Sequence, residues 1–410
     1  MSSKLKGALL SGLVLTLVGG FLAGTSGSAL AQDKVKAWIG HLVHVTGPFA
    51  AGISGVPEGF SDGIEAANKY MDLPGLQLEG FNVDGGSETA KSLQAFKLMT
   101  EGSDPIAVMV GSSTPIDLAL KTWNIRKKMP NITGGSDDEL AKLPSYTFSV
   151  TAPYVNQVGA WIDYYMENVW PKKNQNRPPR FAWLTWDNAF GRAAMTPKTI
   201  EYIKSKGIEI VDEEFIPLTP TDVGAQVLRL KEKGVDFTAG SMYHNALAVV
   251  LKEMDKNGLL DQIDIGMTYA TNSDALISTA HELARNVYIT GLFWPFSTWE
   301  EHAPKYLEYY NKRTPAPSPF GYGAGFSHGL IAAEAVRLAA AAVGPDKVDG
   351  EAVYNALQKM NGFDAWGIGP ANSFSETKRS SQSSVFMIRV NEGKPTVVKE
   401  QPTPDLTNTQ

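Results

Sequence analysis

Cysteine is absent from this chain of 410 residues. Without a thiol, the protein can have no disulfide bonds, no thiolate ligands for a metal ion and no cysteine nucleophile. A membrane tether through a lipid-modified cysteine is excluded for the same reason. The chain must therefore be stabilised by its hydrophobic cores alone.

A strong excess of charge is also lacking, because 37 Lys and Arg residues stand against 43 Asp and Glu residues. The formal net charge of −6 gives no reason to expect binding to nucleic acid or to an anionic membrane. No G-x-x-x-x-G-K phosphate loop occurs, and residues 47–55 have too few glycines for a dinucleotide fingerprint. His41 and His44 are three apart on a predicted strand and face opposite sides. We therefore expect no metal, no cofactor and no enzymatic activity.

The N-terminal segment is the one stretch that we interpret as membrane-interacting. Lys4 and Lys6 precede an apolar run, and Ala29-Leu30-Ala31 follows it. A basic start, an apolar middle and small residues two apart predict a secretory signal peptide over residues 1–31, cleaved after Ala31. An uncleaved anchor helix is the alternative, although the run is short for a bilayer span. Export without a lipid tether predicts a location in the periplasm.

After this segment, runs typical of strands alternate with helical periodicities. The first series of predicted elements is 35–45 (strand), 59–71 (helix), 76–83 (strand), 87–101 (helix) and 106–110 (strand), with Pro115 opening a further helix. The second series is 181–186 (strand), 191–206 (helix), 208–211 (strand), 222–233 (helix), 235–239 (strand), 244–258 (helix) and 263–268 (strand). Helices at 299–312, 324–342 and 350–360 and a β-like end at 383–398 follow. Two rounds of alternation predict an α/β protein with two mainly parallel sheets, each flanked by helices.

The loops after the strands are the candidate binding positions, because ligands of open α/β sheets bind beyond the carboxyl ends of the strands. Residues 45–52 are rich in glycine and small side chains, which either admit a ligand close to the backbone or form a flexible connection. Residues 111–115 and 132–137 each lead into a helix, where free N–H groups and hydroxyls can hold a carboxylate. The alternative is simple N-capping, by Ser113 or Thr114 in one loop and by Ser136 or Asp137 in the other.

The order of these features resembles one family over nearly the whole chain after residue 31. An export signal, a first strand leading into Thr46-Gly47-Pro48, a later Gly111-Ser112-Ser113-Thr114-Pro115 and two α/β units are similar to type I periplasmic solute-binding proteins of the branched-chain amino acid class. Residues 186–191 resemble the D-x-x-[YF]-G turn of that family, and residues 235–237 resemble its V/I-D-F strand.

The resemblance implies two lobes joined by three crossovers, with a solute held between them by hinge closure. It places one lobe at 32–150 plus 291–367 and the other at 151–290 plus 368–410, with crossovers near 150–151, 289–290 and 367–369. It also implies that the chain is the solute-binding component of an ABC importer. We therefore expect a monomer that delivers a small organic solute to the membrane subunits of an ABC permease.

Family members bind the carboxylate of an amino acid through a hydroxyl and backbone N–H groups of the first lobe. The resemblance transfers this role to Ser112, Ser113, Gly134, Gly135 and Ser136. A lid aromatic from the second lobe matches Tyr243. A further aromatic, from the loop before the long late helix, is Phe320 or Tyr322.

The chain departs from the family at two positions. Tyr269 stands where the family has the acid that pairs with the ammonium group of the ligand, and a tyrosine can hydrogen-bond but cannot neutralise a cation. Ala51 and Gly52 stand where a lid aromatic often lies. We therefore expect the solute to be an amino acid or a related acid, such as a larger or aromatic acid without an α-amine. If the solute has an ammonium group, Asp274 or Asp187 could supply the missing negative charge. The alternative function is that of a ligand-sensing module for a separate membrane receptor.

Overall fold

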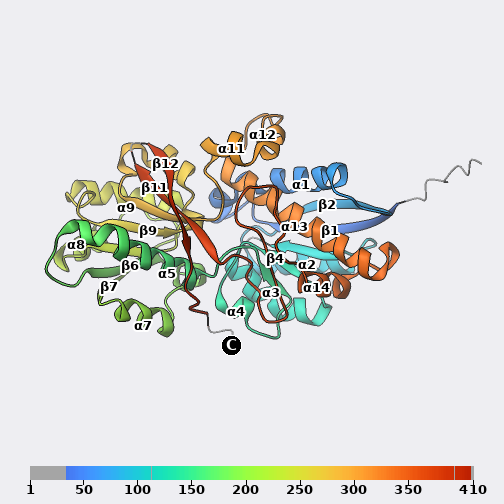
Figure 1. The fold of residues 1–410 in the computed structure, drawn as a ribbon, viewed down its shortest axis with the longest axis horizontal. Helices are drawn as coiled ribbons and strands as arrows, with labels where there is room; N and C mark the ends of the chain where they lie inside the picture. The colour runs from blue at the N-terminus through green and yellow to red at the C-terminus, as the bar shows by residue number, and fades with distance from the viewer. Residues whose placement is uncertain (1–33, 112, 392, 408–410) are drawn as a thin grey trace, which may run out of the picture. The chain divides into compact units, whose positions relative to one another are not determined.

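The computed structural model describes residues 34–111, 113–391 and 393–407. The predicted signal peptide and Ser112 lie outside these residues. Two sheets organise the described part of the chain (Figure 1), and their strands are mostly parallel. The predicted α/β class with two mainly parallel sheets flanked by helices is therefore confirmed.

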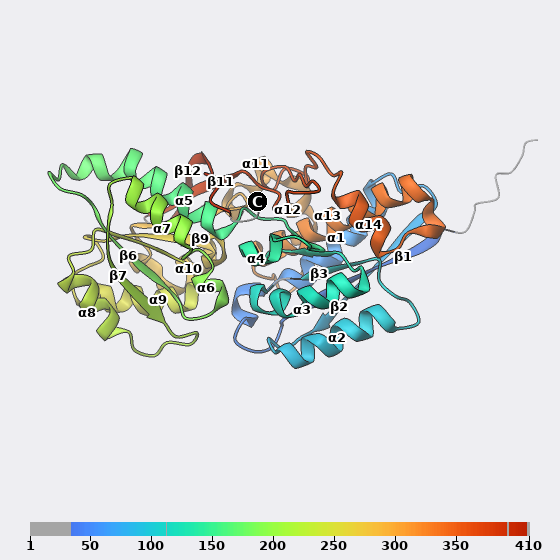
Figure 2. The ribbon, with the colours of Figure 1, turned by 90° about the horizontal axis from the view of Figure 1, so that it is seen from below.

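The first sheet contains five parallel strands in the order β2-β1-β3-β4-β5. They are β1 Val35–Val43, β2 Leu76–Asp84, β3 Val108–Gly111, β4 Asn131–Thr133 and β5 Thr147–Ser149. Figure 2 shows this sheet between α2 and α3 on one side and α1, α13 and α14 on the other. These helices, with the short α4, are α1 Val56–Tyr70, α2 Thr89–Glu101, α3 Thr114–Lys127, α4 Asp138–Ala141, α13 Pro319–Val343 and α14 Gly350–Leu357.

The second sheet contains seven strands in the order β12-β11-β10-β9-β8-β6-β7. The strands from β6 to β10 are parallel, whereas β11 and β12 are joined antiparallel at one edge. The strands are β6 Arg180–Trp186, β7 Glu209–Ile216, β8 Phe237–Gly240, β9 Asp264–Thr268, β10 Val287–Gly291, β11 Ser384–Asn391 and β12 Lys394–Pro402. The helices are α5 Tyr154–Tyr164, α6 Ala189–Arg192, α7 Pro197–Ser205, α8 Gly224–Glu232, α9 His244–Lys256 and α10 Ser273–Ala280, with α11 Trp299–His302 and α12 Pro304–Tyr310 after β10.

Two predicted helices are each divided in the structure, and this corrects the sequence-based prediction. The helix expected at 191–206 is α6 followed by α7, because Pro197 lacks an N–H and opens a new helix. The helix expected at 299–312 is α11 followed by α12, with Pro304 at the first position of α12. The helix expected at 324–342 begins earlier, at Pro319. The residues assigned to a loop before it therefore belong to its first turns.

Helices α1 and α13 pack unusually close together, and glycines make this possible. A Cβ atom added at Gly59 would lie 2.0 Å from the carbonyl oxygen of Tyr322, and one added at Gly325 would lie 2.0 Å from that of Val56. Any side chain at these positions would force the helices apart. The close packing fixes the rotation of α13, and therefore decides which of its residues face the ends of the strands.

Separate hydrophobic cores cover the faces of the sheets. One surrounds the seven-stranded sheet, and two cover opposite faces of the five-stranded sheet. Tyr269 packs against a core of each sheet. Backbone bonds between Ser149 and the 379–381 segment also join residues that the resemblance assigns to different lobes. The lobe boundaries themselves remain a prediction.

Among the described residues, α13 is the one helix long and apolar enough to cross a membrane by length and composition. Two thirds of its most apolar window, 67%, is buried inside the protein. The same apolar composition is required of a helix that is surrounded by a hydrophobic core. Its packing against α1 therefore accounts for its composition.

Candidate functional site

A cavity lies where the carboxyl ends of strands from both sheets meet. Its wall combines residues after β4 and β9, the first loop, the segment after β10 and one face of α13. This is the position at which open α/β sheets bind ligands. The lining residues are Gly52, Val56, Gly134, Thr151, Tyr243, Tyr269, Ala270, Leu292, Phe293, Phe320, Ala324 and His328.

Tyr269 lies directly after β9 and closes the polar corner of the cavity. Its hydroxyl donates a hydrogen bond to the carbonyl oxygen of Gly134 over 2.5 Å. The Thr151 hydroxyl donates to the same oxygen over 3.3 Å. Burial raises the pKa of Tyr269 well above its ordinary value, so the phenol stays protonated and remains a donor. The side chain at the position of the family acid is therefore uncharged and satisfied by the protein.

Tyr243, the predicted lid aromatic, stands at the start of α9 and contacts the first loop. Its ring packs against Trp186, with 4.7 Å between the ring centroids. A Cβ atom added at Gly52 would lie 2.1 Å from Cε2 of Tyr243, so the ring covers the Gly52 backbone. The neighbouring Ala51 lies in the short 3-10 helix Ala50–Ile53. The absence of a side chain at Gly52 thus lets the lid ring reach the loop itself.

Ser113 occupies the N-cap position of α3, but its side chain accepts no capping hydrogen bond. Its Oγ is buried and has no hydrogen-bond partner among the described residues. An unpaired buried hydroxyl is costly, which favours the anion-site interpretation over simple capping here. In the other loop the capping alternative holds, because Asp137 accepts a hydrogen bond from the backbone N–H of Glu139.

Ser136 and Gly135 are buried beside Gly134 but do not line the cavity. The Ser136 hydroxyl lies 3.4 Å from the carbonyl of Thr151 and 3.5 Å from Oγ of Ser380, so both contacts are long. The N–H of Gly135 donates to the Thr133 hydroxyl over 2.9 Å. Ser136 therefore supports the loop, and its hydroxyl is held only weakly.

A buried carboxylate, Asp117, lies beneath these loops. It accepts hydrogen bonds from Nδ2 of Asn131 over 2.9 Å and from the Thr133 hydroxyl over 2.6 Å. Burial raises its pKa to about 6 despite these bonds. The network fixes the ends of β3 and β4, which carry Ser113 and Gly134.

Phe320, Ala324 and His328 form the α13 wall of the cavity. They are spaced four residues apart, which places them on one face of the helix. His328 was missed by the sequence-based prediction, which treated 319–323 as a loop and could not define the helix phase. The four-residue spacing from Phe320 is the signal that could have identified it.

His328 is a buried histidine for which no protein partner is found among the described residues. Its side chain is 4% exposed, and Nδ1 is buried without a hydrogen bond. Its Nε2 edge faces Gly134, since a Cβ atom added there would lie 3.6 Å from Cε1 and 3.9 Å from Nε2. Burial lowers its pKa to about 4, so the imidazole is neutral at neutral pH.

Tyr322, the alternative to Phe320 in the prediction, does not line the cavity. Its ring is fully buried between α1 and α13, and its hydroxyl donates to Asp62 over 2.5 Å. Arg313 donates to the same carboxylate, which completes a buried polar cluster. The structure thus brings Phe320 to the cavity and places Tyr322 in the packing of the first sheet.

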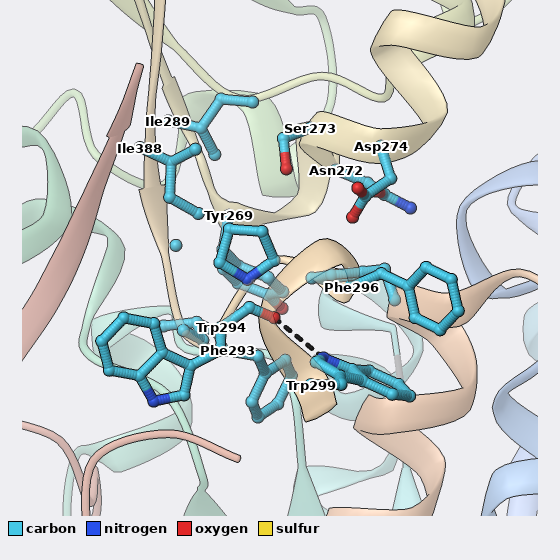
Figure 3. Close-up of a pocket in the computed structure, with 14 residues that line it drawn as sticks. Tyr269, Asn272, Ser273, Asp274, Ile289, Phe293, Trp294, Phe296, Trp299 and Ile388 are labelled. Atoms are coloured by element: carbon cyan, nitrogen blue, oxygen red, sulfur yellow. Dashed lines mark hydrogen bonds between the residues drawn. The ribbon is translucent and has the colours of Figure 1, made fainter. Parts of the chain in front are cut away.

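A second cavity adjoins the first and is lined in part by Asp274 (Figure 3). In Figure 3 Asp274 and Ser273 lie on one side, and the rings of Phe293, Trp294 and Trp299 lie on the other. The two cavities share Tyr269, Leu292, Phe293 and Phe320 as a common wall. Asp187, the other predicted source of charge, pairs with Arg192 and lines neither cavity.

Two further observations concern enzymatic chemistry. No group of His, Cys, Asp and Glu side chains suited to holding a metal ion occurs in the described part of the chain. One G-x-S-x-G pattern, typical of a hydrolase nucleophile, does occur at residues 325–329. It lies inside α13, whereas the nucleophile needs a sharp strand-to-helix turn, and Ser327 is buried there. The glycines of this pattern serve the packing against α1.

Comparison with known proteins adds independent findings. The model of a family described as "Periplasmic binding protein" matches residues 37–395. No curated protein matches the sequence. The structure of a branched-chain amino acid ABC transporter protein from Thermus thermophilus with bound valine has a TM-score of 0.80 at 22% identity, over 92% of this chain and 98% of that one.

Two other solved structures share the fold at similar identity. A fatty acid ABC transporter substrate-binding protein from Thermomonospora curvata has a TM-score of 0.77 at 20% identity, over 92% of this chain and 95% of that one. An extracellular ligand-binding receptor from Rhodopseudomonas palustris HaA2 has a TM-score of 0.70 at 19% identity, over 89% of this chain and 100% of that one. The matched family comprises solute-binding proteins and not enzymes, which confirms the expectation of no enzymatic activity.

Proposed function

Because this chain belongs to the periplasmic binding protein family, we propose that it is the solute-binding component of an ABC importer. The solute is a small organic molecule that bears a carboxylate, either an amino acid or a related acid. The observation that carries this proposal is the cavity at which strand ends of both sheets converge, with Tyr243, Tyr269, Gly134 and Phe320 in its lining. Aromatic walls with a few polar groups are typical of small-molecule sites.

The mechanism is hinge closure between two lobes at 32–150 plus 291–367 and 151–290 plus 368–410. The ligand contacts groups of both lobes and therefore stabilises the closed form. Membrane subunits of an ABC permease then recognise that form. The protein acts as a monomer in the periplasm, after removal of residues 1–31.

A ligand screen tests this proposal. Native mass spectrometry of freshly purified protein is followed by thermal unfolding with amino acids, aliphatic acids and aromatic acids. A true ligand raises the melting temperature with concentration, by the free energy RT ln(1 + [L]/Kd). Small-angle X-ray scattering should show a smaller radius of gyration with that ligand. A complete screen without a stabilising solute contradicts the proposal.

A second candidate is a sensing module for a separate membrane receptor. It is favoured by the likeness to an extracellular ligand-binding receptor from Rhodopseudomonas palustris HaA2. Both candidates need the same ligand-dependent closure. A pull-down of the ligand-bound protein from membranes separates them, because the first proposal expects permease subunits and the second expects a receptor.

A further inference from the structure

We propose that the cavity selects an organic acid without an α-ammonium group, and that His328 donates a hydrogen bond to its carboxylate. This inference rests on the proposed solute-binding function and narrows the class of solute. It concerns a residue that the resemblance to the family did not assign. Three features of the cavity carry it.

The first feature is that the cavity offers an α-ammonium group no counter-charge. Among its described lining residues there is no Asp or Glu. The nearest carbonyl oxygen, that of Gly134, already accepts hydrogen bonds from the hydroxyls of Tyr269 and Thr151. A carbonyl oxygen has two lone pairs, so this one is saturated. An ammonium group that leaves water without gaining a carboxylate partner is strongly unfavourable.

The second feature is the orientation of the His328 imidazole. Nδ1 is buried without a partner, and an unpaired buried acceptor is less costly and more common in proteins than an unpaired buried N–H. The proton of the neutral ring therefore belongs on Nε2, which faces Gly134 and the cavity. This tautomer presents a hydrogen-bond donor, and its partner on the solute must be an acceptor such as a carboxylate oxygen.

The third feature is the apolar remainder of the wall. Side chains of aliphatic and aromatic residues surround the donors, and they complement a branched aliphatic or aromatic body. These side chains are Val56, Ala270, Leu292, Phe293, Phe320 and Ala324. Ser113, whose hydroxyl is buried without a partner at the N-cap of α3, does not line this cavity.

Asp274 is the competing explanation, since a carboxylate in an aromatic cavity can bind an amine. It lies beyond the shared wall of Tyr269, Phe293 and Phe320, in the neighbouring cavity. A backbone hydrogen bond with Phe296 also holds this side chain. His328 lines only the first cavity, and Asp274 lines only the second.

The test compares solutes that differ only in the α-amino group. Isovalerate is paired with valine, isocaproate with leucine and hydrocinnamate with phenylalanine, and dissociation constants are measured by calorimetry on the full chain. We expect the deaminated member of the best pair to bind at least about tenfold more tightly, because the amino acid must desolvate its ammonium. Tighter binding of the amino acid overturns the inference while leaving the proposed function intact.

Variants then test the role of His328. His328→Leu removes the donor and should weaken binding of the best acid about 10- to 100-fold, the range for a hydrogen bond to a charged group. His328→Gln keeps an N–H near the Nε2 position and should retain most of the affinity. His41→Leu is the matched control, because His41 is also buried with an unpaired Nε2 but does not line the cavity.

Unfolding measurements keep this test interpretable. The apo form of His328→Leu should melt at or above the temperature of the unchanged protein, because the substitution removes two unpaired nitrogens from an apolar wall. Unchanged acid affinity in a folded His328→Leu protein contradicts the role of His328. Binding of only acceptor-free solutes, such as amines, overturns the whole inference, and binding of no solute at all contradicts the proposed function.

Discussion

The hydroxyl of Tyr269 donates to the carbonyl oxygen of Gly134 over 2.5 Å, and this bond joins the end of β9 in one sheet to the end of β4 in the other. The resemblance to the family places at position 269 an acid that pairs with the ammonium group of the ligand. Here a neutral donor occupies the position, and it binds the protein itself. The hydrogen of the Tyr269 hydroxyl is therefore used within the protein, and this position carries no negative charge for an ammonium group.

The first prediction concerns Tyr269 itself. Tyr269→Glu should raise the affinity for an α-amino acid relative to the matching deaminated acid by about tenfold or more, because a new carboxylate attracts an ammonium and repels a carboxylate. Tyr269→Phe is the control, which loses the bond to Gly134 at a cost of about 1 kcal/mol in the free energy of unfolding. Calorimetry with leucine and isocaproate measures the ratio, and an unchanged ratio in Tyr269→Glu would exclude contact between this position and the solute.

A second prediction concerns the two serines of the carboxylate loops. Ser113→Ala should weaken binding of an anionic solute about tenfold, because it removes a buried hydroxyl that no protein group satisfies. Ser136→Ala should have a smaller effect, because that hydroxyl already has contacts with Thr151 and Ser380. Unchanged affinity in both variants would remove the carboxylate assignment from these loops.

The sequence predicted most strands of the two sheets but missed β5 and β10, and it failed where burial surrounds a helix. Helix α5 was not predicted, because nearly all of its residues are buried and no polar face gives it a period. The start of α13 resembled a loop, because its glycines have low helix propensity. Their role is the close packing against α1, which depends on contacts that are distant in sequence.

The candidate site was predicted in outline and not in detail. Gly134, Tyr243, Tyr269 and Phe320, to which the resemblance assigns ligand binding, all line the cavity, and their role in binding stays a prediction. His328 could not be identified from the sequence, because the face of α13 on which it lies depends on where the helix begins. The choice between Phe320 and Tyr322 depends on that same phase, because two residues along a helix point to different sides.

A third prediction uses these two aromatic residues as a matched pair. Phe320→Ala should weaken solute binding about 10- to 100-fold, because it removes a ring from the cavity wall. Tyr322→Phe should leave the dissociation constant unchanged and lower the free energy of unfolding, because it removes only the hydroxyl that donates to Asp62. Thermal unfolding and calorimetry of both variants separate binding from stability. A loss of affinity in Tyr322→Phe would mean that the packing of α13 limits the site.

The fourth prediction concerns the loss of stability in acid. Burial lowers the pKa of His328 to about 4, whereas in the unfolded chain it is about 6.5. Between these values the unfolded state binds a proton that the native state does not, so the free energy of unfolding falls as the pH falls. Burial raises the pKa of Asp117 from 3.8 to about 6. Between these pH values the native state binds a proton that the unfolded state does not, so Asp117 raises the free energy of unfolding as the pH falls.

Variants isolate each of these two groups by urea unfolding at pH 7 and pH 5. His328→Leu should reduce the loss of unfolding free energy between these pH values by about 2 kcal/mol, since one proton contributes about 1.4 kcal/mol per pH unit below 6.5. Asp117→Asn should increase the loss, because it removes a group that the native state protonates more readily. The comparison with the unchanged protein cancels the contributions of groups that do not interact with His328 or Asp117. The charge of His328 lowers the pKa of His41, so His41→Leu is measured beside His328→Leu. Equal pH dependence in the unchanged protein and in His328→Leu would show that the imidazole is accessible to protons in the native state, and therefore that it is not sealed into the wall of the cavity.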